Sequence, residues 1–416
     1  MQAGTRLKLR RVLVWLCRAA CGLTFAVSGW SKAIDPWGFL IKTNEYLSVW
    51  GLDLPRELVL TCCIGLATVE FVTGVLLMTG SLKRASSVVA LAMMSFMLPL
   101  TAYIALYNPV SDCGCFGDFF VISNGATFWK NIALTAMIVY LTITNRTVRG
   151  LYAAPIQWLV VAVSVAFPLS LSFIGYNIQP LVDFRPYKTG TELFGEVNDA
   201  DASVVYVYEK EGRRQEFSLS GLPDSTWTFV DVIEPAELTG GFAVNDADGD
   251  DVSPSLAEKT GGVLYLLVAE PGVQFLSRAH YVNRLHEYAA SKGISMIGIA
   301  GAEGESLLEW TALARPHFPV YSAEDTALQQ LARGDAALVY VKDGIIMWKR
   351  NLTGMDPLLP DRQGYENALE SVMPVDDGRA HAIAVALYVA AMCIIYLLSL
   401  SPKILRLFVS HTKKND

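Results

Sequence analysis

The stretch 86-SSVVALAMMSFMLPLTAYIALY-107 decides the fold class of this chain. It contains no charged residue over 22 positions, and a helix needs about 20 mostly apolar residues to cross a bilayer. Because lipid offers the backbone no hydrogen-bonding partner, a run of this kind must cross as a helix. The stretch therefore predicts an integral membrane protein built from α-helices.

Further apolar runs of similar length lie on both sides of this stretch. They span 12–33, 58–79, 127–144, 154–177 and 380–400. Hydrophobic residues make up 52% of the 416 residues and charged residues only 18%, which is more apolar than a typical soluble protein. We predict a four-helix membrane core followed by two further spans.

Basic residues at the ends of these runs predict the orientation of the chain. They gather in the N-terminal segment, in the loops near 80–85 and 145–150, and in the tail 401–416. Cytoplasmic loops are enriched in Lys and Arg, so both termini are expected in the cytoplasm. The expected location is the bacterial inner membrane, with 181–377 in the periplasm. Topology accounts for the basic residues, so no nucleic-acid partner is predicted.

The region 181–377 has the composition of a soluble domain. It holds 32 acidic and 15 basic residues, a net charge of −17. Its first part, 203–221, alternates around a Lys-Glu-Gly turn and predicts a β-hairpin. The segment 241–256 predicts two short strands around an Asp-Gly turn.

From residue 262 onward, strand-like and helix-like segments alternate and predict an α/β domain. The expected strands are 262–270, 294–301, 318–323, 336–344 and 345–352, and the expected helices are about 274–292, 305–315 and 325–333. The pattern resembles the thioredoxin-like fold. However, 269-AEPGVQF-275 replaces the usual C-x-x-C, and 181–377 contains no cysteine. The domain is therefore expected to dock a protein partner without exchanging thiols itself.

The predicted organisation has five parts. They are a four-helix membrane core (1–150), a fifth spanning helix (151–180), a β-rich periplasmic subdomain (181–238), a thioredoxin-like periplasmic domain (239–377), and a sixth spanning helix with a basic cytoplasmic tail (378–416).

The turn 113-CGCFGDFF-120 carries the main candidate site. Cys113 and Cys115 would form a redox pair, because a disulfide that spans one residue closes a strained ring that exchanges readily. The same turn also fits a structural disulfide to Cys62 or Cys63, or a simple tight turn. Cys62 and Cys63 lie near the same side of the membrane, so they are candidate relay or disulfide partners. Asp112 and Asp118 are expected to raise the pKa of the thiols by like-charge repulsion.

Two buried charges are expected in the membrane core. Glu70 lies within the second span, and an intramembrane carboxylate is by default a functional candidate. The favoured interpretation pairs it with Arg18 of the first span, and a quinone- or proton-related role is the alternative. Lys32 and Asp35 are expected to cap and anchor the outer end of the first span.

Three further stretches of the sequence give weaker signals. The Trp- and Tyr-rich loop 34–55 predicts an amphipathic segment seated at the lipid interface. The stretch 245-NDADGDD-251 places its glycine too early for a calcium loop, so a hairpin turn is the better interpretation. Neither the histidines nor the two thiols of the turn give a metal-ligand pattern, so no metal is predicted.

Residues 10–145 resemble the DoxX-like membrane family and, within it, the MauE-type (methylamine-utilisation E) branch. The resemblance rests on 28-SGWSKAIDPWGF-39, on Tyr46 and 54-LP-55, on Glu70, Gly74 and Gly80, and on 113-CGCFGDFF-120 followed by 127-TFWKN-131. The segment 215–231 resembles the extension that follows this core in Bacteroidetes-type proteins. The resemblance implies a four-helix membrane core linked to thiol redox chemistry or protein maturation.

Two functions remain open from the sequence. The first is a scaffold or maturation factor for periplasmic or envelope proteins, linked to thiol–disulfide chemistry, whose partner docks on 181–377. The second is a quinone-coupled thiol–disulfide oxidoreductase that uses Cys113 and Cys115. A transporter is disfavoured, because internal repeats and multiple buried charges are missing.

Overall fold

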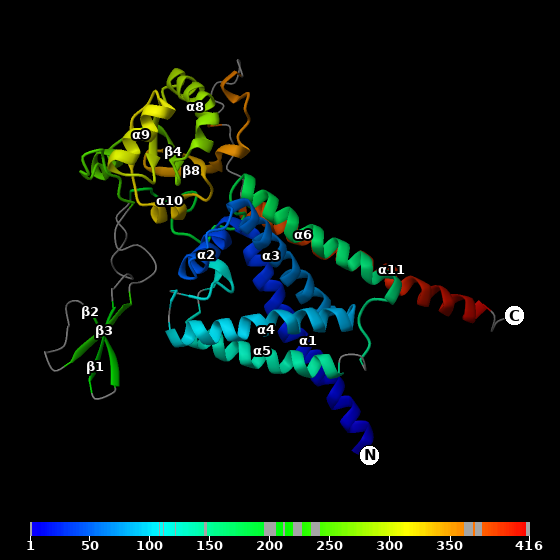
Figure 1. The fold of residues 1–416 in the computed structure, drawn as a ribbon. Coiled ribbons are helices and arrows are strands. Elements are labelled where there is room, and N and C mark those ends of the chain that lie inside the picture. The colour runs from blue at the N-terminus through cyan, green and yellow to red at the C-terminus, as the bar shows by residue number, and fades with distance from the viewer. Residues whose placement is uncertain are drawn as a thin grey trace. The chain divides into compact units, whose positions relative to one another are not determined.

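A computed structural model describes most of the chain, in two compact units (Figure 1). The described residues are 2–107, 109–110, 112–120, 122–144, 148–194, 205–210, 213–218, 227–233, 242–361, 369–370 and 377–412. One unit comprises residues 1–184 and 376–416, and the other comprises 185–375.

The first unit is a bundle of long apolar helices. Its helices are α1 (Gln2–Ile34), α3 (Arg56–Thr79), α4 (Lys83–Tyr107), α5 (Asn124–Thr144), α6 (Gln157–Asn177) and α11 (Asp377–Thr412). Among the described residues, six segments are long and apolar enough to cross a membrane. They coincide with the six predicted runs, so the prediction of a multi-pass helical protein is confirmed.

Close packing of α1 against α3 places the polar residues of the core. A side chain on Gly74 of α3 would collide with the backbone of Ala26, and one on Gly29 of α1 would collide with the backbone of Phe71. Small residues let the backbones of membrane helices approach closely. The glycines therefore bring polar side chains of α1 directly against Glu70 of α3.

The loop after α1 forms a separate short helix, α2 (Pro36–Val49). Asp35 caps it, because its carboxylate accepts a hydrogen bond of 2.8 Å from the backbone N–H of Gly38. Trp37 of α2 stacks on Tyr176 of α6, with ring centroids 5.1 Å apart. The interfacial segment predicted for 34–55 thus contains a helix that is anchored to the bundle.

The turn after α4 is short and contains one 3-10 helix, η1 (Gly117–Phe119). Gly114 and Gly117 adopt φ angles of +65° and +53°, which glycine reaches without steric cost. Because α3 and α4 run in opposite directions, this turn lies at the end of the bundle opposite the α3–α4 connection. The turn places Cys113 and Cys115 over the α1–α3 pair.

The second unit contains a five-stranded sheet with strand order β6-β5-β4-β7-β8. The strands are β4 (Gly262–Val268), β5 (Ser295–Ala300), β6 (Val320–Ser322), β7 (Ala336–Lys342) and β8 (Ile345–Asn351). β4, β5 and β6 are parallel, whereas β7 and β8 are antiparallel to their neighbours. Each expected strand and each expected helix of 262–352 is present.

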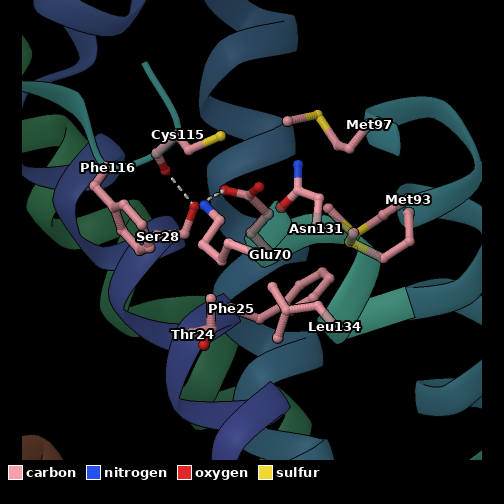
Figure 2. A pocket seen from close by; sticks show the side chains of 12 residues that line it. Thr24, Phe25, Ser28, Glu70, Met93, Met97, Cys115, Phe116, Asn131 and Leu134 are labelled. Carbon is pink, nitrogen blue, oxygen red and sulfur yellow. Dashed lines mark hydrogen bonds between the residues drawn. The ribbon is translucent and has the colours of Figure 1, made fainter. Parts of the chain in front are cut away.

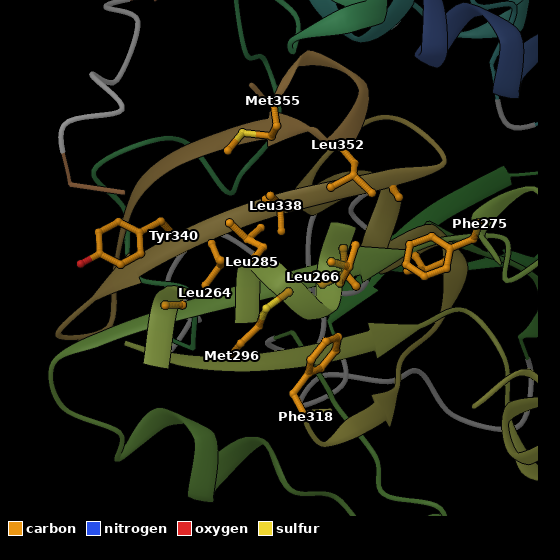
Figure 3. Packing of buried hydrophobic residues seen from close by; sticks show 14 of the residues in the cluster. Leu264, Leu266, Phe275, Leu285, Met296, Phe318, Leu338, Tyr340, Leu352 and Met355 are labelled. Atoms are coloured by element: carbon orange, nitrogen blue, oxygen red, sulfur yellow. The ribbon is translucent and has the colours of Figure 1, made fainter. Parts of the chain in front are cut away.

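Alternate residues of β4 face two cores, as a sheet with both faces covered requires. Leu264 and Leu266 pack with residues of α8 (Val273–Ser291) and α9 (Gly304–Ala314), as Figure 3 shows for Leu285. Tyr265 and Leu267 pack on the other face with residues of α10 (Asp325–Leu331).

A second, three-stranded sheet has the order β2-β1-β3. The hairpin predicted for 203–221 is present as β1 (Val205–Lys210) and β2 (Arg213–Ser218), and β3 (Thr228–Ile233) adds to it. The prediction for 241–256 was wrong in part. A single bridge joins Asn245 and Asp251 around the turn, and a short helix, α7 (Ser253–Ala257), follows in place of a second strand. The Asp251 carboxylate accepts a hydrogen bond of 2.8 Å from the backbone N–H of Ser253, the first residue of α7.

Candidate functional site

The two thiols of the turn face each other. The Cys113 and Cys115 sulfur atoms lie 2.9 Å apart, within hydrogen-bonding distance, and both residues are free thiols. Gly114 between them has no Cβ, and a side chain there would meet the Lys42 chain. The left-handed glycine and its close neighbour therefore hold the two cysteines in one compact turn.

Backbone hydrogen bonds from two helices fix this turn. The Tyr46 hydroxyl of α2 donates to the Cys113 carbonyl at 3.0 Å. From α1, the Ser28 hydroxyl lies 2.6 Å from the Cys115 carbonyl. Because both helices are packed into the bundle, the position of each cysteine is set by the membrane core.

Lys42 compensates the acidic residue beside the turn. Its ammonium group lies 2.6 Å from an Asp112 carboxylate oxygen and 2.9 Å from Glu45. Like-charge repulsion from Asp112 and Asp118 was expected to raise the pKa of both thiols. That expectation is wrong for Cys115, because a hydrogen bond from Cys113 and the charges of Lys130 and Lys32 lower its pKa.

The two thiols differ in acidity. The pKa of Cys115 is lowered to about 7, chiefly by a hydrogen bond from Cys113 and also by Lys130 and Lys32, against the effects of burial and of Glu70. The pKa of Cys113 is raised, because the same hydrogen bond and burial favour its protonated form. Cys115 is thus the more acidic thiol of the pair and the one that ionises first, with Cys113 as its hydrogen-bond donor.

A buried ion pair lies directly beneath Cys115. The Lys32 ammonium is 2.7 Å from a Glu70 carboxylate oxygen, and both side chains are less than 10% exposed. Ser28 lies between this pair and the turn: its hydroxyl is 3.1 Å from the same Glu70 oxygen and accepts from Lys32 at 3.3 Å. The single hydroxyl proton of Ser28 can go either to Glu70 or to the Cys115 carbonyl, so the charge pair and the cysteine turn are coupled.

This pair corrects two predictions. Glu70 was expected to pair with Arg18, and Lys32 to anchor the helix end. Arg18 instead donates to the carbonyls of Val148 and Arg149, at 2.9 and 3.2 Å. It lies more than three helical turns from Lys32 along α1, at the other end of the bundle, so it cannot reach Glu70.

The remaining cysteines are also free thiols in the structure. Cys63 is buried, with its sulfur atom 3.3 Å from the Thr43 hydroxyl of α2. Cys62, the neighbouring residue on α3, is exposed, and Cys393 is exposed on α11. The relay or disulfide role of Cys62 and Cys63 stays a prediction.

A pocket leads from Cys115 into the membrane core (Figure 2). Its empty space amounts to about 370 Å³ only when the open solvent at its mouth is counted, and the enclosed part is far smaller. Four helices, α1, α3, α4 and α5, and the turn contribute its lining: Thr24, Phe25, Ser28, Glu70, Met93, Met94, Met97, Cys115, Phe116, Lys130, Asn131 and Leu134.

Sequence reasoning missed Ser28 and the lining residues of α4 and α5. Ser28 and Lys32 are four residues apart in 28-SGWSK-32 and share a helix face, which is the signal that could have paired them with Glu70. Three methionines within 93–97 were a further signal of an adaptable wall. Among the residues that the structure describes, no group of three or more His, Cys, Asp or Glu side chains could hold a metal.

In the part of the chain that the structure describes, six helices able to span a membrane and a separate α/β unit define a multi-pass membrane protein with a soluble domain. Residues 10–144 match the family model described as methylamine utilisation protein MauE. The membrane core that holds the cysteine turn is therefore similar to MauE-type membrane proteins. Residues 202–234, which include the β2-β1-β3 sheet, match a domain of unknown function, DUF8463. No curated protein matches the chain.

Proposed function

We propose that this protein is a membrane thiol–disulfide oxidoreductase that forms disulfides in an extracytoplasmic protein during its maturation. The observation that supports this most strongly is the 2.9 Å separation of the Cys113 and Cys115 sulfur atoms. Two thiols held this close by a compact turn convert to a disulfide with little backbone movement. The similarity of residues 10–144 to MauE agrees with a role in maturation.

The reaction follows from the unequal acidity of the pair. A partner thiolate attacks the Cys113 sulfur of the 113–115 disulfide, and Cys115 leaves as a thiolate. The better leaving group is the thiol of lower pKa, and Cys115 has a pKa of about 7. A second thiolate of the partner then attacks the partner's sulfur atom in the mixed disulfide. Cys113 is released, the partner gains one disulfide, and the pair holds the two electrons as a dithiol.

The buried Lys32–Glu70 pair gives the thiolate a fixed electrostatic setting. Lys32 is held in place by Glu70 at 2.7 Å and by Ser28. Because this pair is buried, its ammonium group acts on the Cys115 thiolate with less screening than in solvent, and Glu70 offsets part of the effect. Lys32 and Ser28 are positioning residues for this chemistry, because the structure gives neither of them a contact with the sulfur atoms.

The α/β unit is proposed to select the partner. It contains no cysteine and carries the acidic excess of the chain, and its strand order agrees with a thioredoxin-like interpretation. We place this unit and the cysteine turn on the periplasmic side of the bacterial inner membrane, with both termini in the cytoplasm. The distribution of Lys and Arg supports this orientation.

Trapping tests the proposal. In cells that produce Cys115→Ser, Cys113 lacks its resolving thiol, so a mixed disulfide with the partner should accumulate and disappear on reduction. Cys62→Ser is the matched control and should behave as wild type. Function that survives the double change Cys113→Ser and Cys115→Ser, with no trapped species from Cys115→Ser, would refute thiol exchange and leave the scaffold as the better account.

A further inference from the structure

The proposed cycle leaves the pair reduced after each turnover, so something must oxidise it again. Oxidation of a dithiol releases two electrons and two protons. The α/β unit has no cysteine with which to accept the electrons. An acceptor that reaches Cys115 through the membrane core has a direct route, because the pocket begins at this residue.

The pocket runs along the bundle within the membrane-spanning segments. Cys115 and Phe116 lie at one end, and Thr24, Phe25 and Leu134 lie at the other (Figure 2). Thr24 lies one helical turn before Ser28, so the pocket extends about 6 Å along α1.

Two of the residues that line the pocket are partly exposed on helices of the bundle. Thr24 and Met93 line the pocket and are partly exposed. Both belong to segments that are long and apolar enough to cross a membrane. We therefore expect a ligand dissolved in the lipid to enter the pocket beside these two residues.

The lining combines an adaptable apolar wall with a few polar groups. Met93, Met94 and Met97 form one side, and methionine side chains adjust readily to the shape of a flat ring. On another side, Lys130 can donate a hydrogen bond, and the amide of Asn131 is fixed by donation to Thr101 at 3.2 Å. Apolar walls with few well-placed polar groups are typical of sites for small organic ligands.

We propose that this pocket binds the ring of a lipid-soluble quinone, which reoxidises the Cys113–Cys115 pair. The inference rests on the proposed function. In the step, two S–H bonds break and one S–S bond forms. The two electrons and two protons pass to the quinone, which gains two O–H bonds and leaves as the quinol.

The charged groups around the pocket suit this step. Lys130 lines the pocket, and its ammonium group lies 4.6 Å from the centre of the Phe116 ring. It can stabilise the charge that develops on a quinone oxygen. The Cys115 thiolate, which the same lysine favours, is the electron-rich sulfur nearest to the ligand. Lys130 therefore favours both the Cys115 thiolate and the reduced form of the quinone.

The experiment measures oxidation of the reduced, full-length protein in lipid nanodiscs without oxygen. Decylubiquinone and menaquinone-4 are the probes, because their fully substituted rings cannot add a thiol. Each should be converted to quinol with the loss of two protein thiols per quinone. Glutathione disulfide serves as a separate, water-soluble oxidant of the same pair.

Pocket-filling variants localise the reaction. Leu134→Trp and Met93→Trp should each slow quinone reduction at least tenfold and leave oxidation by glutathione disulfide unchanged. Leu66→Trp, on the exposed face of α3, is the control and should match wild type. The second filling variant keeps the test valid if the first does not fold.

The outcomes separate the two proposals. If glutathione disulfide oxidises the pair but neither quinone does, the quinone site is refuted and the proposed function stands. The pocket is also refuted if quinones react but both filling variants keep the wild-type rate. If neither oxidant forms the 113–115 disulfide, the proposed function itself fails.

Discussion

Replacing Glu70 by Gln should destabilise the membrane core strongly, because it leaves Lys32 charged and buried. The Lys32 ammonium lies 2.7 Å from Glu70, with side-chain exposures of 4% and 8%. Removing one partner of a buried pair costs about 3–5 kcal/mol, since the other charge loses its compensation. Ser28 still accepts from Lys32 at 3.3 Å, so we expect a loss near the lower end, about 3 kcal/mol.

A double-mutant cycle isolates the pair from other effects. Lys32→Met alone leaves Glu70 with Ser28, and the double variant Lys32→Met with Glu70→Gln removes both charges. Replacing a buried pair by neutral groups is often close to neutral, so the double variant should be more stable than Glu70→Gln alone. Unfolding of the full chain in mixed micelles, followed by tryptophan fluorescence as detergent is added, gives the free energies.

The result that would refute this reasoning is additivity. If Glu70→Gln costs less than about 1 kcal/mol, or if the two single effects simply sum in the double variant, the ion pair is not what stabilises the junction of α1 and α3.

The other predictions concern the turn and the helix contact. The alkylation rate of Cys115 in the reduced protein should rise with pH through a midpoint near 7, and Cys113→Ala should move that midpoint upward, because donation from Cys113 is the largest cause of the lowered pKa; an unchanged midpoint would refute this cause. Gly74→Ala should lower the free energy of unfolding by more than 1 kcal/mol because its methyl group meets backbone, whereas Gly65→Ala, which has open space around it, should not; equal effects would rule out close helix packing. Tyr46→Phe should cost about 0.5–1.5 kcal/mol by removing one hydrogen bond to the turn, as measured by the same unfolding assay, and no loss would show that the bond does not hold the turn.

Much of the fold could be predicted from the sequence because its signals are local. Apolar runs of about 20 residues mark spanning helices, and the alternation of strands and helices in 262–352 is equally local. The short segment after Asp251 was harder. Its residue pattern resembles a strand, but Pro254 lies at the start of a helix. The fixed φ of proline favours the first helical turn.

The site was only partly predictable because its pairings depend on how the helices pack. Cys113 and Cys115 are adjacent in the sequence, and their closeness needs only a turn. The partner of Glu70 depends on the depth and rotation of α1 against α3, which Gly29 and Gly74 set. The sequence suggested that Arg18 lies as deep in the membrane as Glu70. In the structure Arg18 lies at the end of α1 far from Glu70, where backbone carbonyls accept its hydrogen bonds.

The central claim is that Cys113 and Cys115 cycle between dithiol and disulfide in the cell. Acid quenching, alkylation and mass spectrometry of the peptide that contains both residues measure this directly. After a pulse of dithiothreitol and its removal, the account predicts that a disulfide between Cys113 and Cys115 re-forms within the same peptide. A pair that stays reduced, or that is permanently joined to Cys62 or Cys63, would contradict it.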